Sequence, residues 1–126
     1  MKRWQKLMIF CLALLVLIGV VTCVVGYIGT SDFRERRAVL RPLVATNAPL
    51  REVEAKAGVH FTVTRRGTPE WTQMLTRYTT GSKWDRHIAG MMEAASGVGH
   101  TSTMWMQTLI FLDDRDRLTG FELGAQ

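Results

Sequence analysis

The sequence predicts an α+β fold: one N-terminal transmembrane helix, followed by a small domain of helices packed on one face of an antiparallel sheet with a C-terminal β-hairpin. Three observations support this prediction. An uncharged apolar stretch covers residues 7–29, segments with helical spacing of apolar residues flank a strand-like segment, and an acidic turn separates two apolar segments near the C-terminus. Because the chain has 126 residues, it has room for one small domain beside the transmembrane helix.

The apolar stretch is long enough to cross a bilayer. A helix over residues 7–29 rises about 1.5 Å per residue and reaches roughly 34 Å, whereas the hydrocarbon core of a bilayer is about 30 Å thick. Its apolar residues lie on every side, as lipid requires, which argues against a buried helix of a soluble protein. A cleaved signal peptide and lipidation at Cys23 stay open as alternatives, and a retained anchor is the favoured interpretation.

The basic residues are unevenly distributed along the chain. The net charge is +5, and the tail of residues 1–6 holds three of the 16 basic residues. The other 13 nearly balance the 11 acidic residues, so residues 30–126 lack the strongly cationic surface that nucleic-acid binding needs. We therefore expect the lipid bilayer and another membrane or envelope protein as partners, and no nucleic acid.

Four arginines follow the apolar stretch directly: Arg34, Arg36, Arg37 and Arg41. Because they lie next to the predicted membrane span, we expect them to contact lipid phosphates. The positive-inside rule compares the numbers of basic residues on the two flanks of a membrane span, and these arginines make the two numbers nearly equal. A very short basic tail before a long apolar stretch is typical of signal anchors, so we predict a cytoplasmic N-terminus, a single pass through the cell (inner) membrane and an extracytoplasmic C-terminal domain.

Residues 30–47 are predicted to form a juxtamembrane stalk and linker. Ser31 can cap a short amphipathic helix, which we expect to end before Pro42 because a proline ring disfavours helix at the preceding residue. Residues 43–48 then have the composition of a linker.

The α+β domain is predicted over residues 48–126, and it opens with a short helix. Asn47 is the expected N-cap, Pro49 lies in the first turn and Gly58 closes the helix. Alternating apolar and polar residues over 59–64 then predict a half-buried strand.

Two further helices follow a turn at Arg65-Arg66-Gly67. The first begins with Thr68 as cap and Pro69 in the first turn, and the second begins with a capping box formed by Ser82 and Asp85. Gly97 and Gly99 are expected to end the second helix.

The last segment predicts the C-terminal hairpin, with strands over 103–112 and 118–123 and a solvated turn over 113–116. Residues 104–114, followed by Gly120-Phe121-Glu122, resemble the hairpin of small bacterial envelope proteins of the SmpA/OmlA kind. The resemblance covers only this hairpin, and the strand predicted between helices departs from the order of elements in those proteins. It implies an envelope binding or assembly role and assigns no family.

Aromatic residues offer the leading functional hypothesis. The domain holds Trp71, Trp84 and Trp105, and tryptophan is enriched at protein interfaces. We expect a partner-binding surface around Trp105, with filling of the core as the alternative role for all three residues.

Histidine and methionine residues support an alternative hypothesis, a site for copper or another small ligand. His87 and Met91 lie four residues apart and share a helix face, while Met104 and Met106, on either side of Trp105, are expected to share a strand face. Imidazole and thioether ligands suit Cu(I), although methionine at such spacings also fills cores.

The sequence contains no recognisable catalytic motif. It holds no nucleophile elbow, zinc-protease helix or phosphate-binding loop. We therefore expect no enzyme activity and no cofactor, and the sequence favours a membrane-anchored module that binds another protein.

Overall fold

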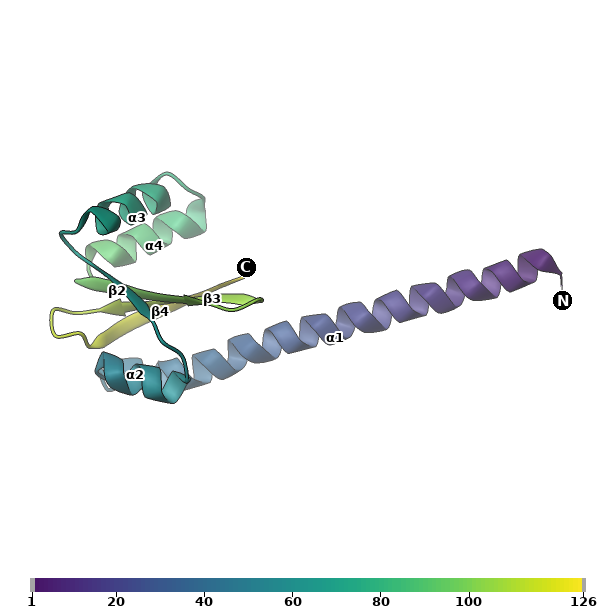
Figure 1. The fold of residues 1–126 in the computed structure, drawn as a ribbon, viewed down its shortest axis with the longest axis horizontal. Coiled ribbons are helices and arrows are strands. Elements are labelled where there is room, and N and C mark those ends of the chain that lie inside the picture. Colours follow the sequence, from purple (N-terminus) through teal and green to yellow (C-terminus); the bar gives the residue numbers. More distant parts are fainter. Residues whose placement is uncertain (1, 126) are drawn as a thin grey trace. The chain divides into compact units, whose positions relative to one another are not determined.

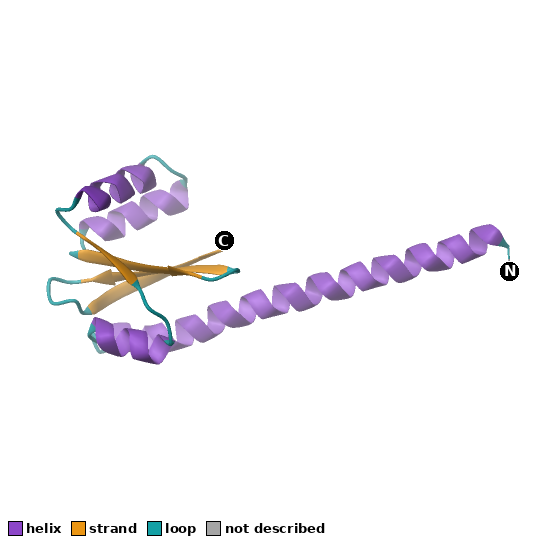
Figure 2. Cartoon of the chain, in the orientation of Figure 1, coloured by secondary structure: helices purple, strands orange, loops and turns teal. Residues whose placement is uncertain are grey.

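The computed structural model describes residues 2–125, so Met1 and Gln126, the ends of the predicted tail and domain, lie outside the described residues. The α+β class is confirmed, because a long N-terminal helix precedes three shorter helices and a four-stranded antiparallel sheet (Figure 1, Figure 2). In chain order the elements are α1 (Arg3–Ala45), α2 (Leu50–Ala57), β1 (Thr62–Arg65), α3 (Pro69–Thr79), α4 (Lys83–Glu93), β2 (Gly97–Ser102), β3 (Met106–Leu112) and β4 (Leu118–Ala125).

The chain divides into two units, Met1–Asp32 and Phe33–Gln126. The described part of the first unit is almost entirely helical, because it holds most of α1. By length and composition α1 is able to cross a membrane, and its large apolar side chains between Leu7 and Ile28 are exposed. Exposed apolar groups on all sides suit a lipid environment, because a helix surrounded by lipid has no face toward water.

The sheet of the second unit is a simple meander, with strand order β1-β2-β3-β4 and antiparallel pairing throughout. The predicted C-terminal hairpin is confirmed as β3 and β4, which pair from Met106 opposite Ala125 to Leu112 opposite Leu118, with a register shift at Phe111 and Leu112. Its first strand was predicted over 103–112 but begins only at Met106, so residues 103–105 form a loop and Met104 does not share a strand face with Met106. The predicted strand over 59–64 is displaced toward the C-terminus, because β1 begins only at Thr62.

The sequence prediction missed β2. Gly97 and Gly99 were expected to end a helix, but α4 already ends at Glu93 and both glycines lie in a strand. Gly99 stands opposite Ile110, where an added Cβ would lie 2.8 Å from Ile110 Cγ1 and 3.1 Å from Phe61 Cβ. This position therefore needs a residue without a side chain, and the close approach explains a glycine inside a strand.

Helices cover both faces of the sheet, not the single face that the sequence predicted (Figure 1). Successive residues of β3 alternate between the two faces, so each face acquires its own core. Leu109 and Phe111 pack with α3 and α4, whereas Ile110 and Leu112 pack with α2 and the end of α1. The first core contains Trp71, Tyr78, Ile88, Ala89, Met92, Ala95 and Val98, and the second contains Leu40, Leu43, Ala48, Val53, Phe61 and Leu118.

The end of α1 differs from the predicted stalk and linker. The helix does not stop before Pro42 but continues to Ala45, with the proline inside it. Leu40 and Leu43 are almost completely buried in the second core. Burial of each such side chain stabilises the fold by about 1.5–3 kcal/mol, which offsets the hydrogen bond that the proline cannot donate.

The start of α2 also corrects the prediction. Asn47 is not the N-cap: its backbone is left-handed, with φ 50°, and its Nδ2 donates to the carbonyl oxygen of Leu118 at 2.9 Å. Pro49 occupies the cap position in extended conformation and offers no side-chain hydrogen bond. The predicted closing residue is confirmed, since Gly58 adopts φ 68° at the C-cap.

The predicted starts of α3 and α4 are confirmed. Thr68 Oγ1 accepts a hydrogen bond from the backbone N–H of Trp71 at 3.2 Å. Ser82 and Asp85 form the predicted capping box, in which each side chain accepts from the backbone N–H of the other residue at 3.4 and 3.1 Å. Both caps satisfy backbone donors that a helix leaves unpaired at its N-terminus.

Candidate functional site: an exposed tryptophan end of the sheet

The three tryptophans of the domain have different environments. Trp71 is only 5% exposed and belongs to the core between the sheet and the two helices α3 and α4. Trp84 and Trp105 are 36% and 41% exposed. Trp71 therefore fills the core, and the other two tryptophans remain available to a partner.

The loop between β2 and β3 holds apolar side chains in solvent. Met104 is 79% exposed, beside Trp105. Three hydrogen bonds between Thr103 and Met106 close this loop. The backbone N–H and the Oγ1 hydroxyl of Thr103 donate to the carbonyl oxygen of Met106 at 2.8 and 3.2 Å, and the backbone N–H of Met106 donates to Thr103 Oγ1 at 3.2 Å. The loop is thus a closed turn, and its hydrogen bonds restrain the backbone that carries the exposed apolar side chains.

Trp84 lies at the same end of the sheet. A Cβ at Gly124 would come within 3.1 Å of the Trp84 ring, so the ring rests on bare backbone of β4. Gly124 pairs with Gln107, one residue beyond Met106, where the loop ends. We call the three residues Trp84, Met104 and Trp105, which lie at this end of the sheet, the tryptophan end.

Helix α4 covers one face of β4 with a row of three side chains. Trp84 lies over Gly124, His87 contacts Glu122, and Met91 lies over Gly120. His87 Nε2 and Glu122 Oε1 are 3.0 Å apart, and both side chains are partly exposed. This row fixes α4 on the edge strand and thereby positions Trp84.

The residues of the copper hypothesis occupy different environments. His87 and Met91 share a face of α4, as their spacing predicts, and His87 already has a carboxylate partner. Met106 is buried, while Met104 projects from the loop. Within residues 2–125 no three histidine, cysteine or acidic side chains form a cluster able to hold a metal ion. A copper site made from these four residues stays a prediction.

The acidic turn between β3 and β4 binds its own chain. Asp113 Oδ1 accepts from the backbone N–H groups of Arg117 and Arg115 at 3.0 and 2.9 Å, which lowers the pKa of this carboxyl below its ordinary value. Arg65 donates two hydrogen bonds to Asp116, at 2.5 and 2.9 Å, and thereby lowers the pKa of Asp116. Both carboxylates therefore stabilise the turn and the adjoining edge of the fold.

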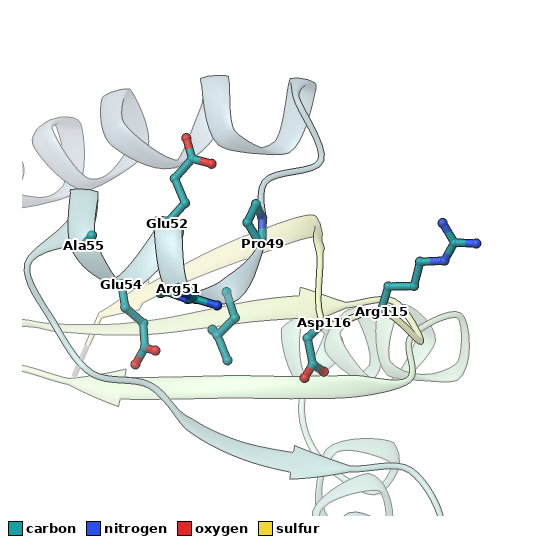
Figure 3. Close-up of a pocket in the computed structure, with 8 residues that line it drawn as sticks. Pro49, Arg51, Glu52, Glu54, Ala55, Arg115 and Asp116 are labelled. Atoms are coloured by element: carbon teal, nitrogen blue, oxygen red, sulfur yellow. The ribbon is translucent and has the colours of Figure 1, made fainter.

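A groove lies between α2 and this turn, and charged side chains of both signs line it (Figure 3). All three of its carboxylates have partners in the chain: Glu52 pairs with Lys56 inside α2 at 3.4 Å, and the other two reach outside the helix or the turn. Glu54 Oε2 accepts from the backbone N–H of Phe61 at 2.9 Å and lies 2.7 Å from His60 Nδ1, while Asp116 pairs with Arg65. These contacts join α2 and the turn to β1, so we assign them a structural role.

The four juxtamembrane arginines do not act as one group. Arg34, Arg37 and Arg41 line an exposed face of α1, together with Ala38, Pro42 and Ala45. Arg36 is partly buried and lies on the other side of the helix, toward Leu40 and Leu43. The structure therefore divides the four arginines into an exposed group of three and a fourth residue that belongs to the domain.

Arg66 is a structural residue that the sequence prediction missed. Its Nε donates to the carbonyl oxygen of Ala95 at 2.9 Å, and its Nη2 donates to those of Met92 at 3.1 Å and of Glu93. The guanidinium also lies 5.5 Å from the centre of the Trp71 ring. No local signal reveals this role, because the accepting carbonyls lie far along the chain.

No known protein family, characterised protein or solved structure gives a significant match to this chain.

Proposed function

We propose that the chain is a single-pass, membrane-anchored domain without catalytic activity, which binds another membrane or envelope protein through the tryptophan end. One observation supports this proposal above all others: the closed loop between β2 and β3 presents Met104 and Trp105 to solvent. An exposed apolar pair on a fixed loop has little conformational entropy to lose on binding, which favours a specific contact.

The chemistry of the tryptophan end suits a protein partner. Tryptophan is among the residues that contribute most to binding energy, and methionine adapts its shape to an apolar pocket. The Trp84 ring packs closely against the backbone of Gly124, so its position is already restricted. Burial of a large side chain contributes about 1.5–3 kcal/mol, so these three residues are sufficient for the centre of a small interface.

The proposed location follows from the N-terminal sequence. The long apolar part of α1 is the proposed membrane span, and the short basic tail before it favours a cytoplasmic N-terminus. The domain then lies outside the cytoplasm, attached to the cell (inner) membrane, where its partner is another protein of the membrane or envelope.

Site-specific photo-crosslinking in intact cells tests the proposed surface. A photoreactive amino acid is placed at position 104 or 105 of the full chain, and as a matched control at Gln73, which is exposed on α3. We expect one discrete protein adduct from positions 104 and 105 and none from position 73. The adduct should disappear when a second substitution, Trp84→Ala, removes the neighbouring ring.

Two results would overturn the proposal. One is the absence of a protein adduct from both loop positions, and the other is equal crosslinking from position 73. Expression and thermal unfolding of each variant serve as folding controls, because exposed loop positions tolerate substitution with changes within about 0.5 kcal/mol.

A further inference from the structure

Helix α1 carries a shallow groove on the exposed face of its domain segment. Three arginines form its rim and three small or cyclic apolar residues form its floor. The lining residues are Arg34, Arg37, Ala38, Arg41, Pro42 and Ala45.

This face is opposite to the core side of the helix. With 3.6 residues per turn, positions 34, 38, 41 and 45 fall on one stripe, while Leu40 and Leu43 fall on the opposite stripe and are buried against the domain. The rim arginines therefore point away from the domain, and the fold does not use them for packing.

The rim arginines are available to an anion. Among residues 2–125, the structure shows no hydrogen bond or ion pair from Arg34, Arg37 or Arg41. Their spacing places three guanidinium groups along about 10 Å of helix. A guanidinium binds phosphate through two parallel hydrogen bonds, so phosphate is the anion that this group fits best.

The floor of the groove distinguishes a phospholipid from free phosphate. Ala38, Pro42 and Ala45 offer only apolar surface between the arginines, which suits the glycerol and upper acyl groups of a lipid but gives nothing to an inorganic ion. The groove also begins only a few residues after the apolar stretch of residues 7–29, where lipid headgroups would lie.

We propose that this groove binds the phosphate of an anionic phospholipid, with Arg34, Arg37 and Arg41 as its ligands. The inference rests on the membrane span of the proposed function but not on a protein partner. It assigns no lipid contact to Arg36, which lies on the opposite side of the helix.

Native mass spectrometry of the full chain in detergent tests the groove. The probe is an equimolar mixture of phosphatidylglycerol and phosphatidylcholine, and the readout is the occupancy of each lipid on the protein. A basic residue near a membrane contributes a factor of about five to the affinity for anionic lipid, so the triple variant Arg34→Gln, Arg37→Gln and Arg41→Gln should lose roughly 100-fold in affinity for phosphatidylglycerol.

A second triple variant supplies the matched control. Arg51→Gln, Arg77→Gln and Arg86→Gln remove the same charge from exposed positions elsewhere in the domain. We expect this variant to retain phosphatidylglycerol within about twofold of the wild type, since a loss through net charge alone would affect both triple variants equally. Replacing the three groove arginines by lysine should give an intermediate loss, because lysine keeps the charge but lacks the two-pronged geometry.

Three outcomes would overturn the inference: a groove variant that keeps its affinity, a control variant that loses as much, or displacement of the lipid by millimolar inorganic phosphate, which would indicate a free-phosphate site. The crosslinks from positions 104 and 105 should persist in the groove variant. Failure of the groove is therefore distinguishable from failure of the tryptophan end.

Discussion

Arg66 should stabilise the domain because it donates hydrogen bonds to the backbone carbonyl groups at the C-terminus of α4. This helix ends without glycine in a left-handed cap, so its last carbonyl groups need other donors. The Arg66 guanidinium donates to the carbonyl oxygens of Met92, Glu93 and Ala95, and it stacks on Trp71. The perturbation that removes both contacts while keeping an apolar stem is Arg66→Met.

The expected cost of Arg66→Met is about 2 kcal/mol. Hydrogen bonds to a charged group contribute about 1.5–3 kcal/mol, and an exposed cation–π contact adds about 0.5–1 kcal/mol. Arg66 itself is solvent-exposed, so screening reduces their sum toward the lower limit. For a domain of this size, a loss of about 2 kcal/mol lowers Tm by roughly 10 °C.

The assay is thermal and urea unfolding of the full chain in detergent, followed by tryptophan fluorescence. The control is Arg77→Met, because Arg77 also lies on an aromatic ring, 5.3 Å from the centre of Tyr78, while within residues 2–125 no hydrogen bond from its guanidinium to a helix carbonyl is found. We expect a loss of about 0.5–1 kcal/mol for this control, since only the cation–π contact is removed. Equal losses for the two variants, or an unchanged Tm for Arg66→Met, would refute the role of Arg66 as a helix cap.

Two further predictions concern the sheet and the acidic turn. Gly99→Ala should destabilise the domain by about 1–3 kcal/mol, because the added Cβ would collide with Ile110. Gly90→Ala, on the open face of α4, should instead stabilise the domain by about 0.5–1 kcal/mol. Urea unfolding of the two variants measures these free-energy changes, and equal effects would contradict the role of packing at Gly99. The pairing of Asp116 with Arg65 lowers the carboxyl pKa, so its stabilisation is complete above the ordinary value of 3.8 and is lost as the pH falls through the lowered value. The difference in urea midpoint between wild type and Asp116→Asn should therefore shrink below about pH 4, and a difference that is constant from pH 6 to pH 2 would count against the pairing.

Local chemistry determined the parts of the fold that the sequence predicted correctly. The helix starts at Thr68 and Ser82 depend on side chains within three residues of the backbone donors they satisfy. The left-handed end at Gly58 and the acidic turn before β4 are equally local. Such signals do not need tertiary context, because donor and acceptor are neighbours in the chain.

Long-range packing determined the parts that the sequence prediction missed. Strand β2 contains two glycines and lacks an apolar alternation, since its glycine at position 99 makes room for Ile110 on the next strand. The helix continues through Pro42 because Leu40 and Leu43 are buried against the domain. The sheet is covered on both faces for the same reason, as the end of α1 supplies a second core.

The candidate site was predicted in part. Trp105 is partly exposed, as a binding surface requires, but nothing in the sequence distinguishes it from Trp71, which is buried. The exposure of a tryptophan depends on which side of its element faces the core. Arg36 illustrates the same limit, because only the burial of Leu40 and Leu43 separates it from the other three arginines.

The most direct test of the account is membrane integration of the full chain, combined with protease access to the exposed turn around Arg66. One portion of the membranes is extracted with alkaline carbonate, and protease is added from the extracytoplasmic side to a separate portion that is left intact. We predict that the uncleaved chain stays in the membrane pellet and that the protease reaches the domain only from this side. Release of the chain into the supernatant, removal of the apolar stretch, or access only from the cytoplasmic side would contradict a membrane-anchored extracytoplasmic domain.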